Sequence, residues 1–240
     1  MDKSVENNKP IKNRKRFRDF LPIIVIVVSV IIIVIEGFVY YQRSYLTPFW
    51  VNGQSMYPTL NLDAVYPNGE KIGEEGGSAT IGSIVDYGVM DEHKGAINKL
   101  KRFDIVITKY VSNADDSSKI KRIIGLPGET VQFKNTGAGN KHNGDLYING
   151  KLVEQPIESK YIVNGLYSDT KWTLKENQYI VCGDNRAHSY DSRDSHVGAI
   201  STDMIKGKAV ALCGKAEVYV TDSGKLGVKN IDYYWPRYFK

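Results

Sequence analysis

The sequence has few of the residues that build metal centres and disulfide frameworks. It contains two cysteines, Cys182 and Cys213, and four histidines among 240 residues. No group of these residues has the spacing of a zinc site, so we expect neither a metal nor another cofactor. Both cysteines fall in expected strands, where a disulfide and two free thiols are equally ordinary, because the sequence does not give their separation.

Excess charge of one sign is scarce outside the amino terminus. The formal net charge is +5, but the basic residues crowd the start of the chain and the remainder is close to neutral. Nucleic acid is therefore not expected as a partner. The sequence lacks internal repeats, and its 42% of hydrophobic and 25% of charged residues are typical of a folded protein. The early basic residues are Lys3, Lys9, Lys12, Arg14, Lys15, Arg16 and Arg18.

A single apolar run is long enough to cross a membrane. It begins at Phe20, carries no charge before Glu36 and ends at Tyr41, which gives a helix of about 33 Å at about 1.5 Å per residue. Because lysine and arginine precede this run, we expect the amino terminus in the cytoplasm and the chain after Gln42 outside it. A cleaved secretory signal has the same order of regions, but cleavage needs small residues where 36–42 are mostly bulky. The organisation that we expect is a cytoplasmic segment 1–19, a cell-membrane anchor 20–41 and an extracytoplasmic domain 42–240.

After the anchor, short β-branched and aromatic runs alternate with Gly, Asn and Asp. This pattern predicts a mainly β fold, in which an all-β domain follows the single helix and 130–178 form a smaller inserted β subdomain. Leu146 to Lys151, followed by Val153, is typical of a hairpin with an Asn-Gly turn. The expected strands are 63–66, 104–110, 120–125, 130–133, 145–148, 179–182, 206–212 and 216–220, and the intervals 67–101 and 135–144 are expected to be loops or insertions.

The segment 51–60 contains a serine in a setting that would hold it at a defined angle. Gly53 supplies flexibility before Ser55, and the ring of Pro58 fixes the local φ after it. Taken alone, the segment favours a surface turn, because these residue types are ordinary in turns. A catalytic serine needs a second group to activate it.

A lysine in the segment 119–129 is a candidate for that group. In a strand, a period of two residues places Lys121 on one face and Arg122 on the other, so we expect one cation inward and the other outward. Burial disfavours the ammonium form, and a base near neutral pH needs a lysine pKa about 2 to 3 units below about 10.4. The alternative is a solvated lysine on an edge strand.

The loop 183–193 is dense in hydrogen-bonding groups. Aspartate and arginine alternate along it, which predicts internal ion pairs that make a long loop rigid. Ser189 could accept a hydrogen bond from a neutral amine. A polar surface loop is the alternative.

Together these stretches resemble, in order, the motifs of bacterial type I signal peptidases. The matching stretches are Ser-Met-Tyr-Pro-Thr at 55–59, Arg-Phe-Asp-Ile-Val at 102–106, Lys-Arg-Ile-Ile-Gly-Leu-Pro-Gly-Glu at 121–129, and Gly-Asp-Asn-Arg at 183–186 with the polar residues that follow. The resemblance covers most of the chain after the anchor. It implies a membrane-anchored serine endopeptidase that removes signal peptides from exported preproteins after small residues at P1 and P3, next to the lipid bilayer and the secretion translocon.

The resemblance also implies roles for individual residues. Ser55 would be the nucleophile and Lys121 the general base of a Ser/Lys dyad that works through an acyl-enzyme. Ser189 would orient the lysine, and the Ser55 N–H would donate to the oxyanion. The supporting ion-pair residues would be Asp184, Arg122, Asp191 and Arg193, and the substrate-binding residues Gly53, Gln54 and Met56.

Three departures from the family pattern stand out. Some relatives carry a serine in place of Gly53, where its hydroxyl is a second oxyanion donor, so here that donor is unassigned. Phe103 replaces the usual glycine of its box, which we interpret as a packing change. Four residues separate Arg193 from Gly198 where two are expected, so this loop is expected to differ in shape.

Two other functions compete with this interpretation. A catalytically silent signal-peptidase-like chaperone in surface-fibre assembly would keep the fold, but it would not need both Ser55 and Lys121. A Ser/His/Asp hydrolase would use His188 or His196 in place of the lysine. Self-cleaving repressors of the DNA-damage response share a similar dyad, but they lack a membrane anchor.

Overall fold

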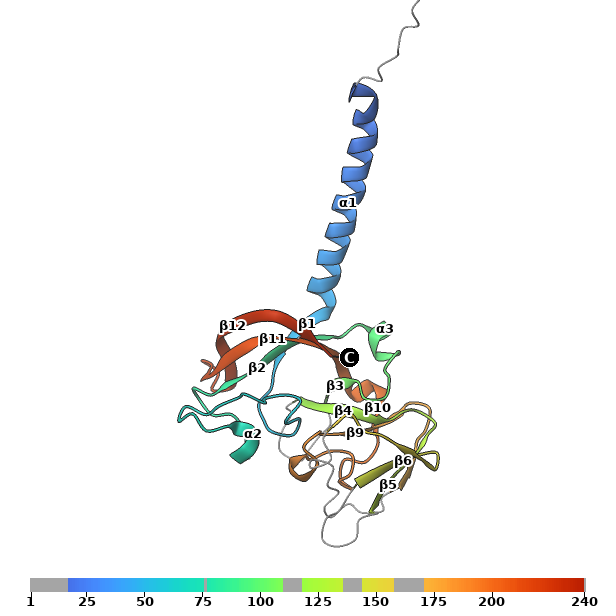
Figure 1. The fold of residues 1–240 in the computed structure, drawn as a ribbon, viewed down its shortest axis with the longest axis vertical. Helices are drawn as coiled ribbons and strands as arrows, with labels where there is room; N and C mark the ends of the chain where they lie inside the picture. The colour runs from blue at the N-terminus through green and yellow to red at the C-terminus, as the bar shows by residue number, and fades with distance from the viewer. Residues whose placement is uncertain (1–16, 76, 110–117, 136–143, 158–170, 240) are drawn as a thin grey trace, which may run out of the picture. The chain divides into compact units, whose positions relative to one another are not determined.

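The computed structural model describes residues 17–75, 77–109, 118–135, 144–157 and 171–239 (Figure 1). The chain forms two compact units, Met1–Ser44 and Tyr45–Lys240. The first contains most of the helix α1 (Phe17–Tyr45), whose apolar part from Phe20 to Tyr41 is 22 residues long and sufficient to cross a bilayer. This apolar part coincides with the expected 20–41.

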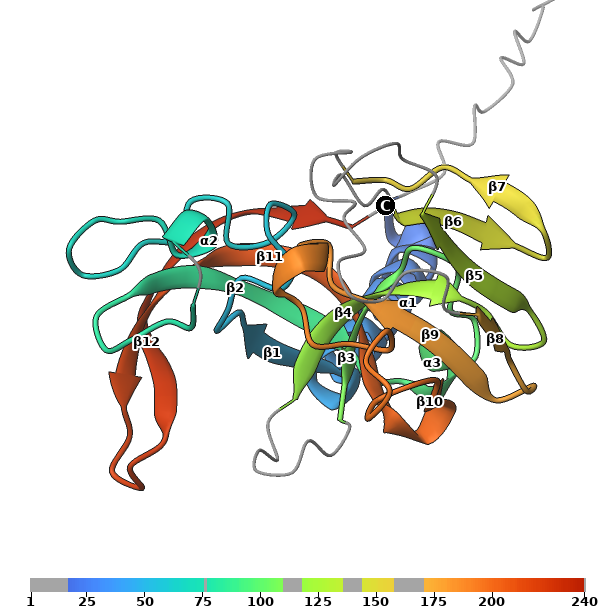
Figure 2. The same cartoon turned by 90° about the horizontal axis from the view of Figure 1, so that it is seen from below.

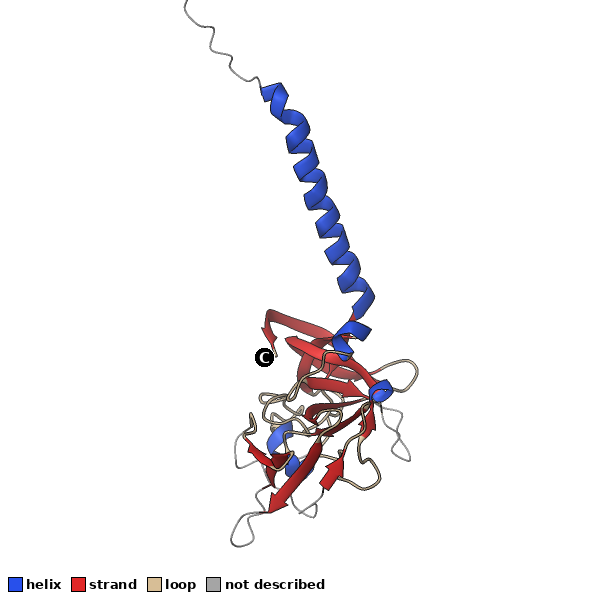
Figure 3. Ribbon diagram, turned by 90° about the vertical axis from the view of Figure 1, so that its right-hand side faces the viewer, coloured by secondary structure: helices blue, strands red, loops and turns tan. Residues whose placement is uncertain are grey.

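The second unit is built mainly from strands, which confirms the predicted fold class (Figure 3). Its larger sheet has eight strands in the order β1-β2-β11-β3-β4-β9-β10, with β12 paired to β11. All of these pairs are antiparallel, and β4 lies in the middle of the sheet between β3 and β9 (Figure 2). The strands are β1 (Leu46–Trp50), β2 (Ile84–Asp91), β3 (Ile105–Thr108), β4 (Lys119–Gly125), β9 (Gln178–Cys182), β10 (Ile200–Ser201), β11 (Ile205–Val220) and β12 (Leu226–Tyr238).

A second sheet of four strands, in the order β7-β6-β5-β8, lies between β4 and β9 in the chain. Its strands are β5 (Thr130–Asn135), β6 (Gly144–Ile148), β7 (Lys151–Val153) and β8 (Lys171–Thr173). Phe133 and Leu146 from this sheet are fully buried against Ile124 and Ile180 of the larger sheet. The small sheet therefore covers one face of β4.

The hairpin predicted at the Asn-Gly pair is confirmed. Ile148 pairs with Lys151, and the two residues between them, Asn149 and Gly150, have φ of 50° and 79°. Positive φ at both central residues is the geometry that Asn-Gly favours in a two-residue hairpin.

Several strand predictions were wrong or incomplete. Residues 63–66 contain only isolated bridges at Val65, and the two strands expected at 206–212 and 216–220 are the single strand β11. β2 lies inside the interval 67–101, which was expected to be a loop because glycine and charged residues are frequent there. β1, β8, β10 and β12 were not predicted, since pairing with a neighbouring strand rather than their own composition specifies them.

Both cysteines are free thiols, Cys182 buried and Cys213 partly exposed. A few short helices also interrupt the β domain. Most of the loop expected at 135–144 lies outside the described residues. The short helices are α2 (Ile72–Glu75), α3 (Lys94–Ile97), η2 (Arg186–His188) and η3 (Thr202–Met204).

Candidate active site

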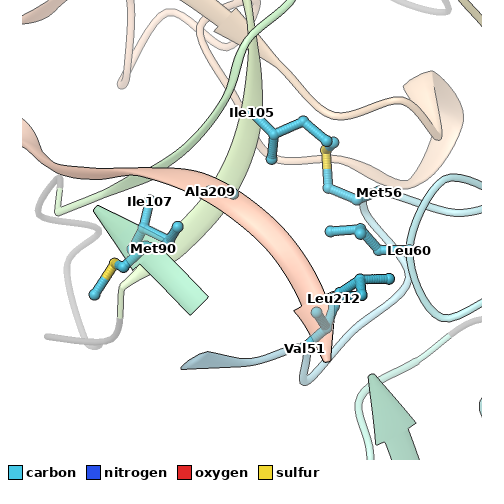
Figure 4. Close-up of a cluster of buried hydrophobic side chains, with 8 residues drawn as sticks. All are labelled: Val51, Met56, Leu60, Met90, Ile105, Ile107, Ala209 and Leu212. Atoms are coloured by element: carbon cyan, nitrogen blue, oxygen red, sulfur yellow. The ribbon is translucent and has the colours of Figure 1, made fainter. Parts of the chain in front are cut away.

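Ser55 lies in a turn that buried apolar neighbours hold in place. The Tyr57 N–H donates to the Gln54 carbonyl at 2.9 Å, and the Leu60 N–H to the Met56 carbonyl at 3.0 Å. Met56 and Leu60 are fully buried in one core cluster with Val51 (Figure 4). The apolar residues on both sides of Ser55 thus anchor the segment, while Ser55 itself remains partly exposed.

Asn61, which the sequence analysis missed, holds the same segment in place through side-chain hydrogen bonds. Its side-chain amide donates to the carbonyls of Val51 at 2.8 Å and Gly53 at 3.2 Å. Asp86 completes the arrangement, because its N–H donates to Asn61 Oδ1 at 2.9 Å and its carboxylate accepts from the Asn61 N–H at 2.6 Å. Asn61 has φ of 59°, a conformation that Asn adopts more readily than most residues. The residue type is therefore the signal in the sequence that fits its role.

Lys121 extends from β4 to Ser55. Lys121 Nζ donates to Ser55 Oγ at 2.8 Å and to the Ile120 carbonyl at 3.0 Å. The lysine is 3% exposed, and β4 is a central strand, so the alternative of a solvated lysine on an edge strand is wrong. Burial lowers the pKa of Lys121 to about 8, an effect that the charge of Asp191 opposes and that of Lys119 reinforces.

Arg122 is buried as well, which corrects the expectation that one cation of β4 points outward. Its guanidinium forms a two-point ion pair with Asp184, from Nε to Oδ1 at 2.7 Å and from Nη2 to Oδ2 at 2.5 Å. The Thr59 hydroxyl also donates to Asp184 at 2.6 Å. The argument from strand period failed because it assumed one solvent-facing side, whereas both faces of β4 are covered.

The loop 183–193 contains the internal ion pairs that its sequence predicts. Arg193 donates to both carboxylate oxygens of Asp191, at 2.8 and 3.0 Å, and the Gly183 N–H donates to the same carboxylate at 2.9 Å. Burial is the largest single influence on the pKa of Asp191 and raises it. The charge and hydrogen bond of Arg193, together with the hydrogen bonds of Ser189 and the Gly183 N–H, outweigh burial and leave the pKa below its ordinary value. The Asn185 N–H donates to the Ser55 carbonyl at 3.1 Å, so this rigid loop also fixes the backbone of the serine.

Ser189 lies beside this network without completing a bond to Lys121. Its hydroxyl oxygen is buried and has no well-formed hydrogen bond among the described residues, although it is close enough to Asp191 to help lower the pKa of that carboxyl. A Cβ at Gly183 would meet Ser189 Oγ and the Ser55 carbonyl oxygen, each at 2.3 Å. Only glycine therefore allows the close approach of the loop to Ser55.

An open groove of about 690 Å³ runs past Ser55 and Lys121. Gly53 and Gln54 line it, whereas Met56 is in the core and does not. Apolar residues of β1 form much of its wall, together with Ile107 and Ile120. No cluster of His, Cys, Asp and Glu that could hold a metal ion occurs in the part of the chain that the structure describes.

The two histidines that could activate a serine occupy different places. His188 lines the groove, while the His196 side chain is 78% exposed and its Nδ1 lies 2.8 Å from Asp194 Oδ1. The group that contacts Ser55 Oγ is the Lys121 amine.

Comparison with known proteins places these residues in a family context. Residues 18–213 match the family described as "Signal peptidase, peptidase S26". Signal peptidase I S of Bacillus subtilis (strain 168) is 32% identical over 206 residues, covering 82% of this chain and 89% of that protein. Signal peptidase I T of the same organism is 36% identical over 172 residues, covering 67% and 69%. A crystal structure of a signal peptidase I from Enterococcus faecalis V583 is 31% identical, covers 46% of this chain and 96% of that one, and has a TM-score of 0.36.

Proposed function

The chain belongs to the signal peptidase family, peptidase S26, and on that premise we propose that it removes signal peptides from exported preproteins through a Ser55/Lys121 dyad. The observation that carries the proposal is the 2.8 Å hydrogen bond from Lys121 Nζ to Ser55 Oγ. A nucleophile within hydrogen-bond reach of a base whose pKa has been lowered is the arrangement that covalent catalysis needs.

In the proposed acylation, neutral Lys121 takes the proton of Ser55 Oγ while that oxygen attacks the scissile carbonyl carbon. The carbonyl π electrons move onto its oxygen, and the Ser55 N–H donates to the oxyanion. When the tetrahedral intermediate collapses, the C–N bond breaks and the Lys121 ammonium gives its proton to the leaving amine. That amine is the new amino terminus of the mature protein, and the signal peptide remains as an ester on Ser55.

Deacylation uses the same lysine. Neutral Lys121 takes a proton from a water molecule, whose oxygen attacks the ester carbonyl, and the ammonium then returns a proton to Ser55 as the signal peptide leaves as a free acid. The buried ion pairs Arg122–Asp184 and Arg193–Asp191 hold the strand and the loop around the dyad. Ser189 would orient Lys121 during these steps, and its unpaired buried hydroxyl supports that role.

The groove supports binding of an extended peptide. β1 lines the groove and stands at the end of the sheet order, so a substrate can add beside it and pair through its backbone. The specificity that we propose, small residues at P1 and P3, rests on membership of the family, and apolar residues that line the groove, such as Ile107 and Ile120, would contact these side chains. Gly53 and Gln54 would contact the substrate, and Met56 would act through packing.

The membrane topology is part of the proposal. The apolar helix from Phe20 to Tyr41 would anchor the protein in the cell membrane, and the basic residues before it favour a cytoplasmic amino terminus. The catalytic domain would then work outside the cytoplasm, where exported preproteins emerge from the secretion translocon.

The test is cleavage of a preprotein with alanine at P1 and P3 by the full-length protein in detergent. Ser55→Ala and Lys121→Ala should abolish cleavage while the near-ultraviolet circular dichroism stays that of the folded domain. The kcat/KM of the unmodified protein should rise with pH around a midpoint near 8, because Lys121 acts as a base only when neutral. Cleavage that persists in either variant would refute the dyad.

The same assay decides between this function and its rivals. A histidine-dependent hydrolase would lose activity with His188→Ala or His196→Ala, keep it with Lys121→Ala and show a midpoint near about 6.5. A silent chaperone would not cleave at any pH. The contact between Ser55 and Lys121 favours the peptidase, since a silent protein has no need of a buried lysine against a serine.

A further inference from the structure

The proposed oxyanion site has one assigned hydrogen-bond donor, and a second remains to be identified. The Ser55 N–H is one donor, but a tetrahedral intermediate is stabilised best by preorganised donors that converge on its oxygen. Residue 53, two positions before Ser55, is a glycine and offers no side-chain donor. The groove next to Gly53 is therefore the place to look for another hydroxyl.

Ser78 brings a hydroxyl to that place from a distant loop. An antiparallel bridge pairs Gly53 with Ser78, and the neighbouring Ala79 N–H donates to the Asn52 carbonyl at 2.6 Å. Ser78 lines the same groove as Gly53 and Ser55. The backbone contacts thus fix Ser78 directly beside the segment that carries the nucleophile.

The Ser78 hydroxyl lies close to the position that a side chain at residue 53 would occupy. A Cβ built at Gly53 would lie 3.9 Å from Ser78 Oγ and 3.6 Å from the Gly77 carbonyl oxygen. A side chain at position 53 and the Ser78 hydroxyl would therefore be in van der Waals contact. Because Ser78 is exposed to the groove, its hydroxyl can rotate toward a substrate oxygen.

We propose that the Ser78 hydroxyl is the second oxyanion donor of this protein. It donates its hydrogen to the oxygen that becomes negative when Ser55 Oγ attacks, and it keeps its proton throughout the reaction. The proposal rests on the dyad proposed above. The hydrogen bond strengthens as charge develops, so removal of the hydroxyl should lower kcat more than it changes KM.

The first experiment compares Ser78→Ala with the unmodified full-length protein in the preprotein assay. We expect kcat to fall by about 100-fold, the range found when one oxyanion donor is removed, with KM changed by less than about threefold. Thr80→Ala is the matched control, because it shortens an exposed side chain of the same loop that does not line the groove. An unchanged kcat in Ser78→Ala would overturn the proposal, and so would an equal loss in Thr80→Ala.

The second experiment restores the donor from the other side. Gly53→Ser in the Ser78→Ala background should recover most of the lost kcat, because the new Cβ meets its nearest neighbour at an ordinary 3.6 Å and Gly53 is not among the glycines with positive φ. A merely structural role of Ser78 would not be rescued by a hydroxyl at position 53. Failure of rescue would therefore count against the proposal.

Two parallel variants separate this proposal from its premise. Lys121→Ala should be inactive whether or not Ser78 has the proposed role, so an active Lys121→Ala would reject the dyad itself. Gln54→Ala tests another polar side chain that lines the groove beside Gly53. A loss of kcat in Gln54→Ala that Ser78→Ala does not show would assign the donor to Gln54 and refute the role of Ser78.

Discussion

Lys121 and Arg122 are adjacent cations on β4, and their side chains have different hydrogen-bond partners on the two sides of that strand. Both are buried, at 3% and 7% exposure. Arg122 has a carboxylate partner, Asp184, that contacts it at two points. Lys121 donates only to a hydroxyl and a carbonyl among the described residues, and neither carries a charge that would hold its proton. Burial therefore accompanies an ion pair on one side and the proposed base on the other.

The position of Asp191 makes the contrast sharper. Its charge raises the pKa of Lys121, but its oxygens accept hydrogen bonds from Arg193 and the Gly183 N–H, so it does not bond directly to the lysine. Desolvation is the larger effect, and the pKa of Lys121 falls to about 8. A base on this strand thus depends on the carboxylates nearby being occupied by other cations and amides.

The largest expected effect comes from breaking the pair on the Arg122 side. Asp184→Asn leaves a buried guanidinium without its counter-charge, which should lower the free energy of unfolding by about 3 to 5 kcal/mol. Denaturant unfolding of the full-length protein in detergent, followed by near-ultraviolet circular dichroism, measures this loss. Glu217→Gln is the control, because its ion pair with Lys229 is much more exposed, at 31% and 49% of the two side chains, and should contribute about 1 kcal/mol or less. Equal losses in the two variants would show that burial of the pair is unimportant.

On the Lys121 side the sign should be opposite. Between its ordinary value of 10.5 and about 8, the lowered pKa of Lys121 corresponds to a cost of about 3 kcal/mol at neutral pH. Lys121→Met removes the buried charge while keeping most of the volume, so the variant should be inactive yet more stable by up to about 3 kcal/mol. Unfolding midpoints at pH 7 measure this gain.

The pH dependence of that gain tests its cause. Between pH 8 and 10.5 the unfolded state binds the Lys121 proton and the folded state does not, so the stability of the unmodified protein rises with pH relative to Lys121→Met. The difference should be constant below pH 8, shrink through this window and vanish above it. A difference that does not change with pH would mean that packing, rather than the charge, causes it.

The candidate site residues that lie in local sequence motifs could be predicted from the sequence. Ser55, Lys121 and the loop 183–193 were found from residue type and order, and they lie together in the structure. The burial of Arg122 was not predicted, because the strand period says which residues share a face but not whether another sheet covers that face. The sequence likewise could not place β2 or β12, whose partners are distant in the chain.

Positions that act through tertiary partners were also missed. Asn61 and Ser78 have ordinary neighbours in the sequence, and their relation to Gly53 appears only when the loops meet. Phe103 was interpreted as a packing change, but its φ of 73° is a left-handed conformation that glycine adopts without strain. This backbone conformation, which the sequence does not show, is therefore the unusual feature of position 103.

The smallest expected effect concerns the fine adjustment of Lys121 by a neighbouring charge. Lys119 lowers the pKa of Lys121 through repulsion between the two cations, so Lys119→Gln should raise that pKa and move the midpoint of the kcat/KM profile to higher pH. The shift should diminish at high ionic strength, because Lys119 is only partly buried and salt screens its charge. Lys151→Gln, an exposed change in the small sheet, should leave the midpoint unchanged. A midpoint that moves to lower pH in Lys119→Gln would mean that the titrating group is not the Lys121 amine.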